Sequence, residues 1–104
     1  MSDKKFNWTR QPQEVEGQDY WFGGKCFVTA GVQSEIPRDE ILAIVADIQE
    51  FAEKSTGVDY LQSFVNEETG RKIWAIDQVT KASLSSGNHP PEHNYFTVLF
   101  PSEY

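Results

Sequence analysis

Between Pro37 and Gly57, apolar residues recur at intervals of three and four positions, which is the period of one helix face. That face carries Ile41, Ile44, Val45, Ile48, Phe51 and Ala52. Pro37 suits a first helical position, and Gly57 follows Lys54 where helices often end in a left-handed residue. The pattern therefore predicts one amphipathic helix over residues 37–54.

The opposite side of this predicted helix is acidic. Its carboxylates belong to Asp39, Asp47, Glu50 and Glu53. Such a face either stays in solvent or contacts a protein partner. Its spacing also permits it to mimic nucleic acid and to occupy the basic site of a DNA-binding protein.

Runs of aromatic and β-branched residues on both sides of the helix predict β-strands. They comprise a short edge strand at Phe6 and Trp8, followed by 19–22, 25–30, 58–65, 71–79 and 95–100. Gly23 and Gly24 separate two of these runs, which indicates a two-residue hairpin or one long strand with a bulge. The polar turn at 66–70 predicts a further hairpin, and the last run is expected inside the sheet.

The segment 81–94 is rich in Ser, Gly, Asn and Pro, and it is predicted to be a loop that opens with a helical turn. Residues 1–18 are polar and are expected to begin frayed. Together the elements predict one α+β domain over residues 1–104, an antiparallel sheet of four to six strands with the helix packed across one face.

The formal net charge is −7, from 16 acidic and 9 basic residues, and the chain has no local basic patch. Because a phosphate backbone would be repelled, direct nucleic-acid binding is not expected. The single cysteine, Cys26, lies in a predicted strand and is expected to be a small buried apolar residue. With neither a secretory signal nor an apolar run long enough to span a membrane, a cytoplasmic protein is expected.

Both histidines, His89 and His93, lie in the predicted loop beside Glu92. Their imidazoles have the chemistry of a metal-ligand pair or a general base. A His-x3-His pair converges on one metal ion when it lies on a helix, but the neighbouring prolines forbid a regular helix. We therefore interpret the loop as a connector and predict no metal or cofactor.

Asp77 is the polar exception in an otherwise apolar predicted strand. A carboxyl buried there would have a raised pKa, as catalytic acids often do. The competing interpretation is a strand-end Asp that accepts hydrogen bonds from loop backbone amides. Because no base or nucleophile accompanies it in sequence, Asp77 by itself supports no mechanism.

Aromatic residues gather near the predicted N-terminal strands: Trp8, Tyr20, Trp21, Phe22 and Phe27. If Tyr20 and Trp21 are consecutive in one strand, their rings point to opposite faces of the sheet. One ring then needs cover from the N-terminal segment, a second subunit or a ligand. We predict a homodimer with Trp21 or a neighbouring ring near the centre of the interface.

Three groups of residues carry a family resemblance: 28–32 with Ile36 and Pro37; 58–64; and Ile76 and Asp77 with 97–104. They resemble the uncharacterised bacterial family called domain of unknown function 960, whose members are carried on cassette-like mobile elements and phages. The resemblance covers the chain from Phe27 to its end and includes no catalytic motif. It implies a mobile-element accessory protein and assigns no activity.

These observations predict a small acidic binding or interaction protein that is homodimeric and not an enzyme. The competing class is a small enzyme, or a small-molecule binder, with a pocket near Asp77, His89, Glu92 and His93. A structure separates the classes, because an enzyme would have the loop folded over a pocket that contains Asp77 and a histidine.

Overall fold

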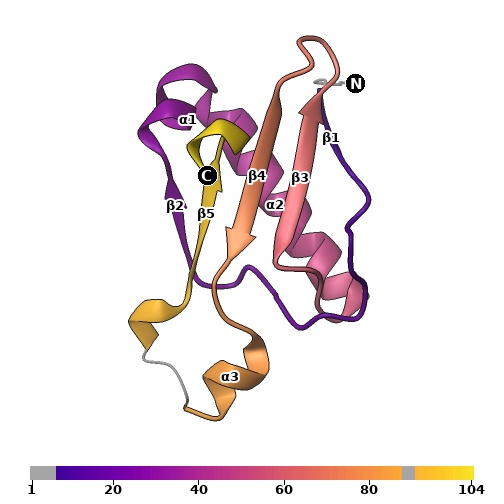
Figure 1. Ribbon diagram of the computed structural model, residues 1–104, viewed down its shortest axis with the longest axis vertical. Coiled ribbons are helices and arrows are strands. Elements are labelled where there is room, and N and C mark those ends of the chain that lie inside the picture. The colour runs from indigo at the N-terminus through magenta and orange to yellow at the C-terminus, as the bar shows by residue number, and fades with distance from the viewer. Residues whose placement is uncertain (1–6, 88–90) are drawn as a thin grey trace.

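A five-stranded sheet and one long helix form the two layers of the computed structural model, which describes residues 7–87 and 91–104 (Figure 1). The strands are β1 (Trp8–Arg10), β2 (Lys25–Val28), β3 (Leu61–Asn66), β4 (Lys72–Asp77) and β5 (Tyr95–Leu99), arranged in the order β1-β3-β4-β5-β2. The helices are α1 (Ala30–Glu35), α2 (Arg38–Ser55) and α3 (Lys81–Ser85), with 3₁₀ turns η1 (Pro91–His93) and η2 (Pro101–Glu103). The predicted α+β fold is confirmed.

Helix α2 is the amphipathic helix that the sequence pattern predicts, and it covers one face of the sheet (Figure 1). Its buried residues are Ile41, Ile44, Ile48 and Ala52, and Val45 and Phe51 are partly buried beside them. Pro37 is the N-cap residue and not the first helical residue, a shift of one position. The helix ends at Thr56, whose backbone is left-handed with φ 57°, and the next residue, Gly57, has φ 101°.

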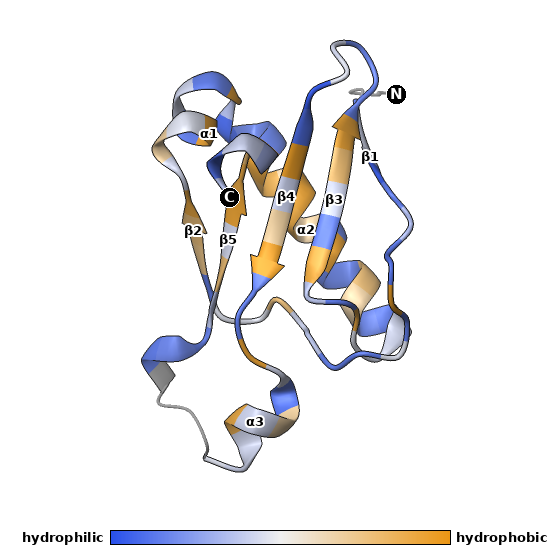
Figure 2. Ribbon diagram, viewed as in Figure 1, coloured by the Kyte–Doolittle hydropathy of each residue, from blue (hydrophilic) through white to orange (hydrophobic). Residues whose placement is uncertain are grey.

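The core lies between α2 and the sheet face turned towards it. From the sheet it takes Phe64, Ile73, Ala75, Phe96 and Val98, all of which are fully buried. Apolar residues dominate the strands in Figure 2, whereas the β3–β4 turn is hydrophilic. At about 1.5 to 3 kcal/mol for each fully buried apolar side chain, this layer is a main source of stability.

One strand pair departs from the predicted antiparallel sheet, because β2 lies parallel to β5. The other three pairs are antiparallel. The reason is the path of the chain: α2 returns the backbone across the sheet, so β3 runs in the direction of β2. The antiparallel sequence β3, β4, β5 then gives β5 that same direction, and β2 docks at its free edge.

The predicted strand at 19–22 and the glycine hairpin after it are wrong. Tyr20 forms only an isolated bridge to Val58, and the residue with positive φ is Phe22, at 54°, not a glycine of the pair. Tertiary contacts hold this left-handed residue: its N–H donates to Asp77 Oδ2 (2.9 Å), and its carbonyl accepts from Gln49 Nε2 (2.9 Å). The fixed bend places the Phe22 ring in the core.

Helix α1 has no counterpart among the predicted elements. It is six residues long and buries only Val32, so no periodic pattern marks it. Thr29 caps its start, since Val32 N–H donates to Thr29 Oγ1 (3.3 Å). Glu103 Oε1 accepts from Phe100 N–H (2.8 Å) and from the Thr29 hydroxyl (2.7 Å), and these two hydrogen bonds lower the pKa of the Glu103 carboxyl.

Other sequence predictions are confirmed. The turn after β3 joins it to β4, β5 lies inside the sheet, and β1 lies at an edge. The helical turn predicted at the start of 81–94 is α3. Phe6, predicted in the first strand, lies outside the described residues. No helix in the described part of the chain is both long and apolar enough to cross a bilayer.

Candidate functional site

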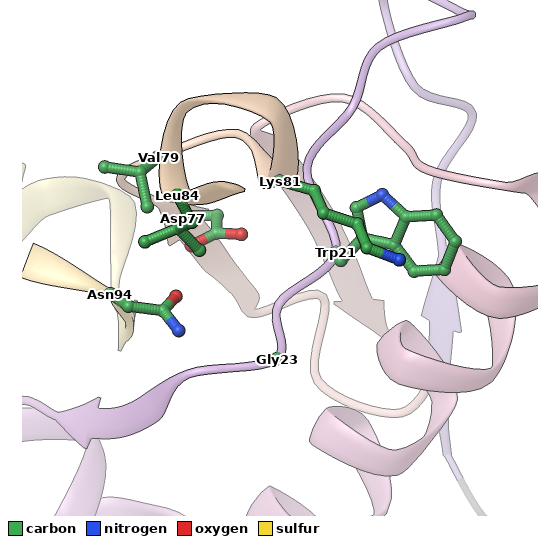
Figure 3. Close-up of a pocket in the computed structure, with 7 residues that line it drawn as sticks. All are labelled: Trp21, Gly23, Asp77, Val79, Lys81, Leu84 and Asn94. Atoms are coloured by element: carbon green, nitrogen blue, oxygen red, sulfur yellow. The ribbon is translucent and has the colours of Figure 1, made fainter. Parts of the chain in front are cut away.

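A cleft of about 210 Å³ opens where β4 ends and α3 begins (Figure 3). Its lining residues are Trp21, Gly23, Asp77, Val79, Lys81, Leu84 and Asn94. They come from the bend after Tyr20, from the end of β4, from α3 and from the residue before β5. The cleft is smaller than the roughly 300 to 1,000 Å³ that is usual for small-molecule sites.

Asp77 is the only carboxylate among the residues that line the cleft, and its side chain is nearly buried, at 5% exposure. Phe22 N–H donates to Oδ2 and Gln78 N–H donates to Oδ1, both at 2.9 Å. Burial raises the pKa of the Asp77 carboxyl, and these backbone donors oppose part of that rise. The geometry matches a strand-end Asp that binds loop amides.

Lys81 is the only cation among the residues that line the cleft. The contact recorded for its ammonium group is with the ring of Trp21 and not with Asp77. The Lys81 Nζ lies 4.4 Å from the centre of the Trp21 ring, and Figure 3 shows its side chain extending towards that ring. Trp21 Nε1 donates to Asp19 Oδ1 (2.9 Å), while Asp19 Oδ2 accepts from Ala82 N–H (2.8 Å). Trp21 therefore helps to attach α3 to the rest of the domain.

The predicted loop 81–94 supplies Lys81, Leu84 and Asn94 to the cleft lining, but no described histidine lines it. Glu92 and His93 are exposed in η1, and neither is among the residues that line it. His89 lies outside the described residues. Within 7–87 and 91–104, no group of three or more His, Cys, Asp or Glu side chains is placed to hold a metal ion.

Replacing His89 and His93 together by Ala is expected to change the free energy of unfolding by no more than about 0.5 kcal/mol, because the sequence predicts a connecting loop and such loops contribute little to stability. Added zinc should leave the melting temperature of wild type and double mutant equally unchanged. Thermal unfolding with and without zinc measures both. A zinc-dependent rise confined to the wild type would instead identify a metal site.

The acidic side of α2 is partly engaged within the protein. Asp47 forms an ion pair with Arg10 of β1, whose guanidinium also lies over the Phe51 ring, 3.9 Å from its centre. Glu50 pairs with Lys54 at 3.2 Å, one turn along the helix. The predicted partner surface therefore has fewer available carboxylates than the sequence suggests.

Two residues near β2 differ from expectation. Tyr20 belongs to no strand; it packs on Tyr60, with ring centres 6.1 Å apart.

Cys26, expected to be buried, is exposed, because β2 is an edge strand and α2 does not cover that part of it. Partial desolvation raises the pKa of the Cys26 thiol, which disfavours the reactive thiolate.

A second candidate site is the sheet face turned away from α2, here called the open sheet face. Strand alternation places on it Phe27 from β2, Leu61, Ser63 and Val65 from β3, Trp74 and Ile76 from β4, and Tyr95, Thr97 and Leu99 from β5. Figure 1 shows this face towards the viewer, with η2 in front of its upper part. In the described chain no other helix covers it.

Cross-strand rows organise the open sheet face. Phe27, Thr97, Ile76 and Leu61 are successive neighbours across four strands, and Leu99, Trp74 and Ser63 form the next row. Two ring pairs add edge-to-face contacts: Phe27 with Tyr95, 5.0 Å between centres, and Trp74 with Tyr104, 5.8 Å. Phe27 is 50% exposed and Tyr104 is exposed.

Sequence reasoning expected the surplus rings around Tyr20 and Trp21, whereas the structure gathers them around Trp74. A signal was present, since β4 and β5 are apolar on both faces. A strand that is apolar on both faces requires cover on both. Only the strand order, however, reveals which residues become neighbours on the uncovered side.

No family model, curated protein or solved structure matches this chain.

Proposed function

We propose that this protein is a small, non-enzymatic interaction protein that forms a homodimer through the open sheet face. The observation that carries the proposal is the composition of that face. The chain has 16 acidic residues, yet the strand positions turned away from α2 carry none. A sheet face that merely meets solvent in so acidic a protein would be expected to carry some of them.

Charge also favours a second copy as the occupant. Two chains of net charge −7 repel one another, so they associate most readily through surfaces without carboxylates. The strands of the open sheet face meet this condition, since their only charged residues on that face are Lys25 and Lys72 at the ends of β2 and β4. Glu103 of η2, in front of the upper part of the face, already accepts hydrogen bonds from Thr29 and Phe100. Helix α2 lies behind the sheet in Figure 1, so its acidic side, which is opposite the buried face of the helix, would point away from the contact.

Aromatic side chains supply suitable contact area at the centre of the proposed interface. Trp74 and Phe27 are the kind of large, rigid residues that dominate binding energy in protein interfaces. The dimer is expected to bury about 1,200 to 2,000 Å² in total. Trp21 is a weaker candidate for the centre, because Asp19 and Lys81 already hold its ring.

The hydrogen bonds of Asp77 support a non-enzymatic function, since both carboxylate oxygens already accept from backbone N–H groups. The resemblance to domain of unknown function 960 supports a role as an accessory protein of a mobile element. In that role the dimer would be the active form, with one acidic α2 helix presented by each copy.

Phe27→Asp is expected to convert the dimer to a monomer at concentrations where the wild type is dimeric, because it places a charge on the open sheet face. Light scattering coupled to size-exclusion chromatography measures the mass. Val15→Asp is the matched control: Val15 is 47% exposed, Phe27 is 50% exposed, and Val15 lies outside the sheet. The control should remain dimeric.

A second variant, Thr97→Lys, tests the same face from β5 and does not alter the edge strand. Circular dichroism and thermal melting identify any variant that has lost its fold. A wild type that stays monomeric at the highest attainable concentration, or folded variants of Phe27 and Thr97 that remain dimeric, would overturn the proposal.

A further inference from the structure

A groove of about 500 Å³ runs between edge strand β2 and helix α2, on the side of β2 opposite the open sheet face. Six of its eight lining residues are Cys or aliphatic: Cys26, Val28, Ile36, Ile41, Leu42 and Val45. Leu42 is 56% exposed, although it lies on a helix that packs on the core. The groove is thus apolar, open to solvent and within the usual size range of ligand sites.

The free edge of β2 borders this groove. Lys25 N–H donates to the carbonyl of Asn94, and Thr29 N–H donates to the carbonyl of Val98, both at 3.1 Å. Because backbone groups alternate along a strand, those of Cys26 and Val28 point to the other edge, where none of the described strands is paired. This edge has no proline or inward-pointing charge, the devices that usually block the addition of another strand.

The positive charge of Arg38 at the groove favours an occupant that carries a carboxylate. Arg38 is the only ionisable side chain among the lining residues besides the Cys26 thiol, and it is exposed. Among the described residues it has no ion-pair or hydrogen-bond partner. A guanidinium beside an apolar groove complements a carboxylate, which it binds through two parallel hydrogen bonds.

We propose that an extended peptide adds to β2 as a further strand in this groove. Its backbone would pair with Cys26 and Val28, its alternate apolar side chains would enter the groove, and a carboxylate would bind Arg38. The carboxylate belongs to the peptide's C-terminus or to an acidic side chain. This site is separate from the proposed dimer face, since neighbouring side chains of β2 point to opposite sides of the sheet.

Fluorescence anisotropy tests the proposal with three labelled heptapeptides of alternating Val and Thr. One ends in a free carboxylate, one is amidated, and one is amidated but has Glu as its last residue. The first peptide, the third or both should bind, on the order of tenfold more tightly than the amidated peptide without Glu. Which of them binds identifies the source of the carboxylate.

Three variants locate the binding site. Val28→Pro removes an N–H that points away from the sheet, Leu42→Asp places a charge in the groove, and Arg38→Gln removes the cation. Each should weaken binding of the preferred peptide by about tenfold or more, whereas Lys72→Gln and Val15→Asp should leave it unchanged. If Val28→Pro fails to fold, Leu42→Asp decides, because it alters only an exposed side chain.

The single cysteine gives an independent measurement, since Cys26 lines the groove and is exposed. Saturating peptide should slow its reaction with a thiol-specific chromogenic disulfide. The proposal is overturned if no peptide binds, or if binding is unaffected by Leu42→Asp and Arg38→Gln. It is also overturned if Val28→Pro dissociates the dimer, because the edge would then pair with a second copy.

Discussion

Ile48→Asp is expected to abolish the cooperative thermal unfolding of the protein, because it leaves the domain largely unfolded at 25 °C. Ile48 is fully buried at the centre of the α2 face that packs on the sheet. The change removes about 1.5 to 3 kcal/mol of burial free energy and adds several kcal/mol for an unpaired buried carboxylate. A domain of this size has about 5 to 15 kcal/mol of stability in total.

Leu42→Asp is the matched control for Ile48→Asp. It makes the same kind of substitution on the same helix, but Leu42 is exposed, so the melting temperature should change little. Circular dichroism at 222 nm and differential scanning calorimetry provide the measurements. Equal melting temperatures for wild type and Ile48→Asp would show that the α2 face does not form the core.

Asp77→Ala is expected to lower the free energy of unfolding by about 2 to 3 kcal/mol, because it leaves the buried N–H of Phe22 without an acceptor. It also removes one of the two contacts that hold Phe22 at positive φ. Urea unfolding measures the loss. An exposed carboxylate, Glu92, serves as control, and Glu92→Ala should change stability by less than about 0.5 kcal/mol.

The effect of Asp77→Ala should depend on pH. Burial raises the folded-state pKa of Asp77 above its ordinary value of 3.8, so the folded protein holds this proton more tightly than the unfolded chain. The contribution of Asp77 to stability is therefore largest below pH 3.8 and falls as pH rises through the raised folded-state pKa. The difference in stability between wild type and Asp77→Ala should decrease over that interval.

Two results would contradict these expectations for Asp77. The first is an Asp77→Ala variant that is as stable as the wild type or more stable, as is common when a catalytic residue is removed. The second is a stability difference that grows with rising pH, which would mean that the pKa of Asp77 is lowered by folding. The first result would favour the enzyme class, whereas the second would mean that the backbone hydrogen bonds to Asp77 outweigh the burial of its carboxyl.

Helix α2 and the β3–β4 hairpin were predictable from sequence because their signals are local. The spacing of Ile41, Ile44 and Ile48 is a property of the helix itself, and the polar turn after β3 reverses the chain wherever the hairpin lies. Helix α1 was not predictable in this way. A helix of six residues with one buried side chain is stabilised by Thr29 and its tertiary contacts, not by a repeating pattern.

The aromatic segment at 20–22 shows how tertiary structure overrides local preference. Consecutive rings favour a strand, but Phe22 instead takes a left-handed conformation. Its backbone is held by Asp77, 55 positions away along the chain, and by Gln49, 27 positions away. No pattern within the segment predicts these two distant contacts. Both errors, the strand at 19–22 and the glycine hairpin after it, have this one cause.

The sequence by itself determined the α+β class, the buried face of α2 and the residue types available for binding, because each depends on neighbours within one or two turns or strands. Tertiary structure decided that β2 lies parallel beside β5, that Trp74 and Phe27 share the open sheet face, and that Arg38 borders a groove. Those features depend on strand order. Strand order depends on pairing between segments far apart in the chain, such as β2 with β5, whereas the packing of α2 sets only the direction in which β3 returns.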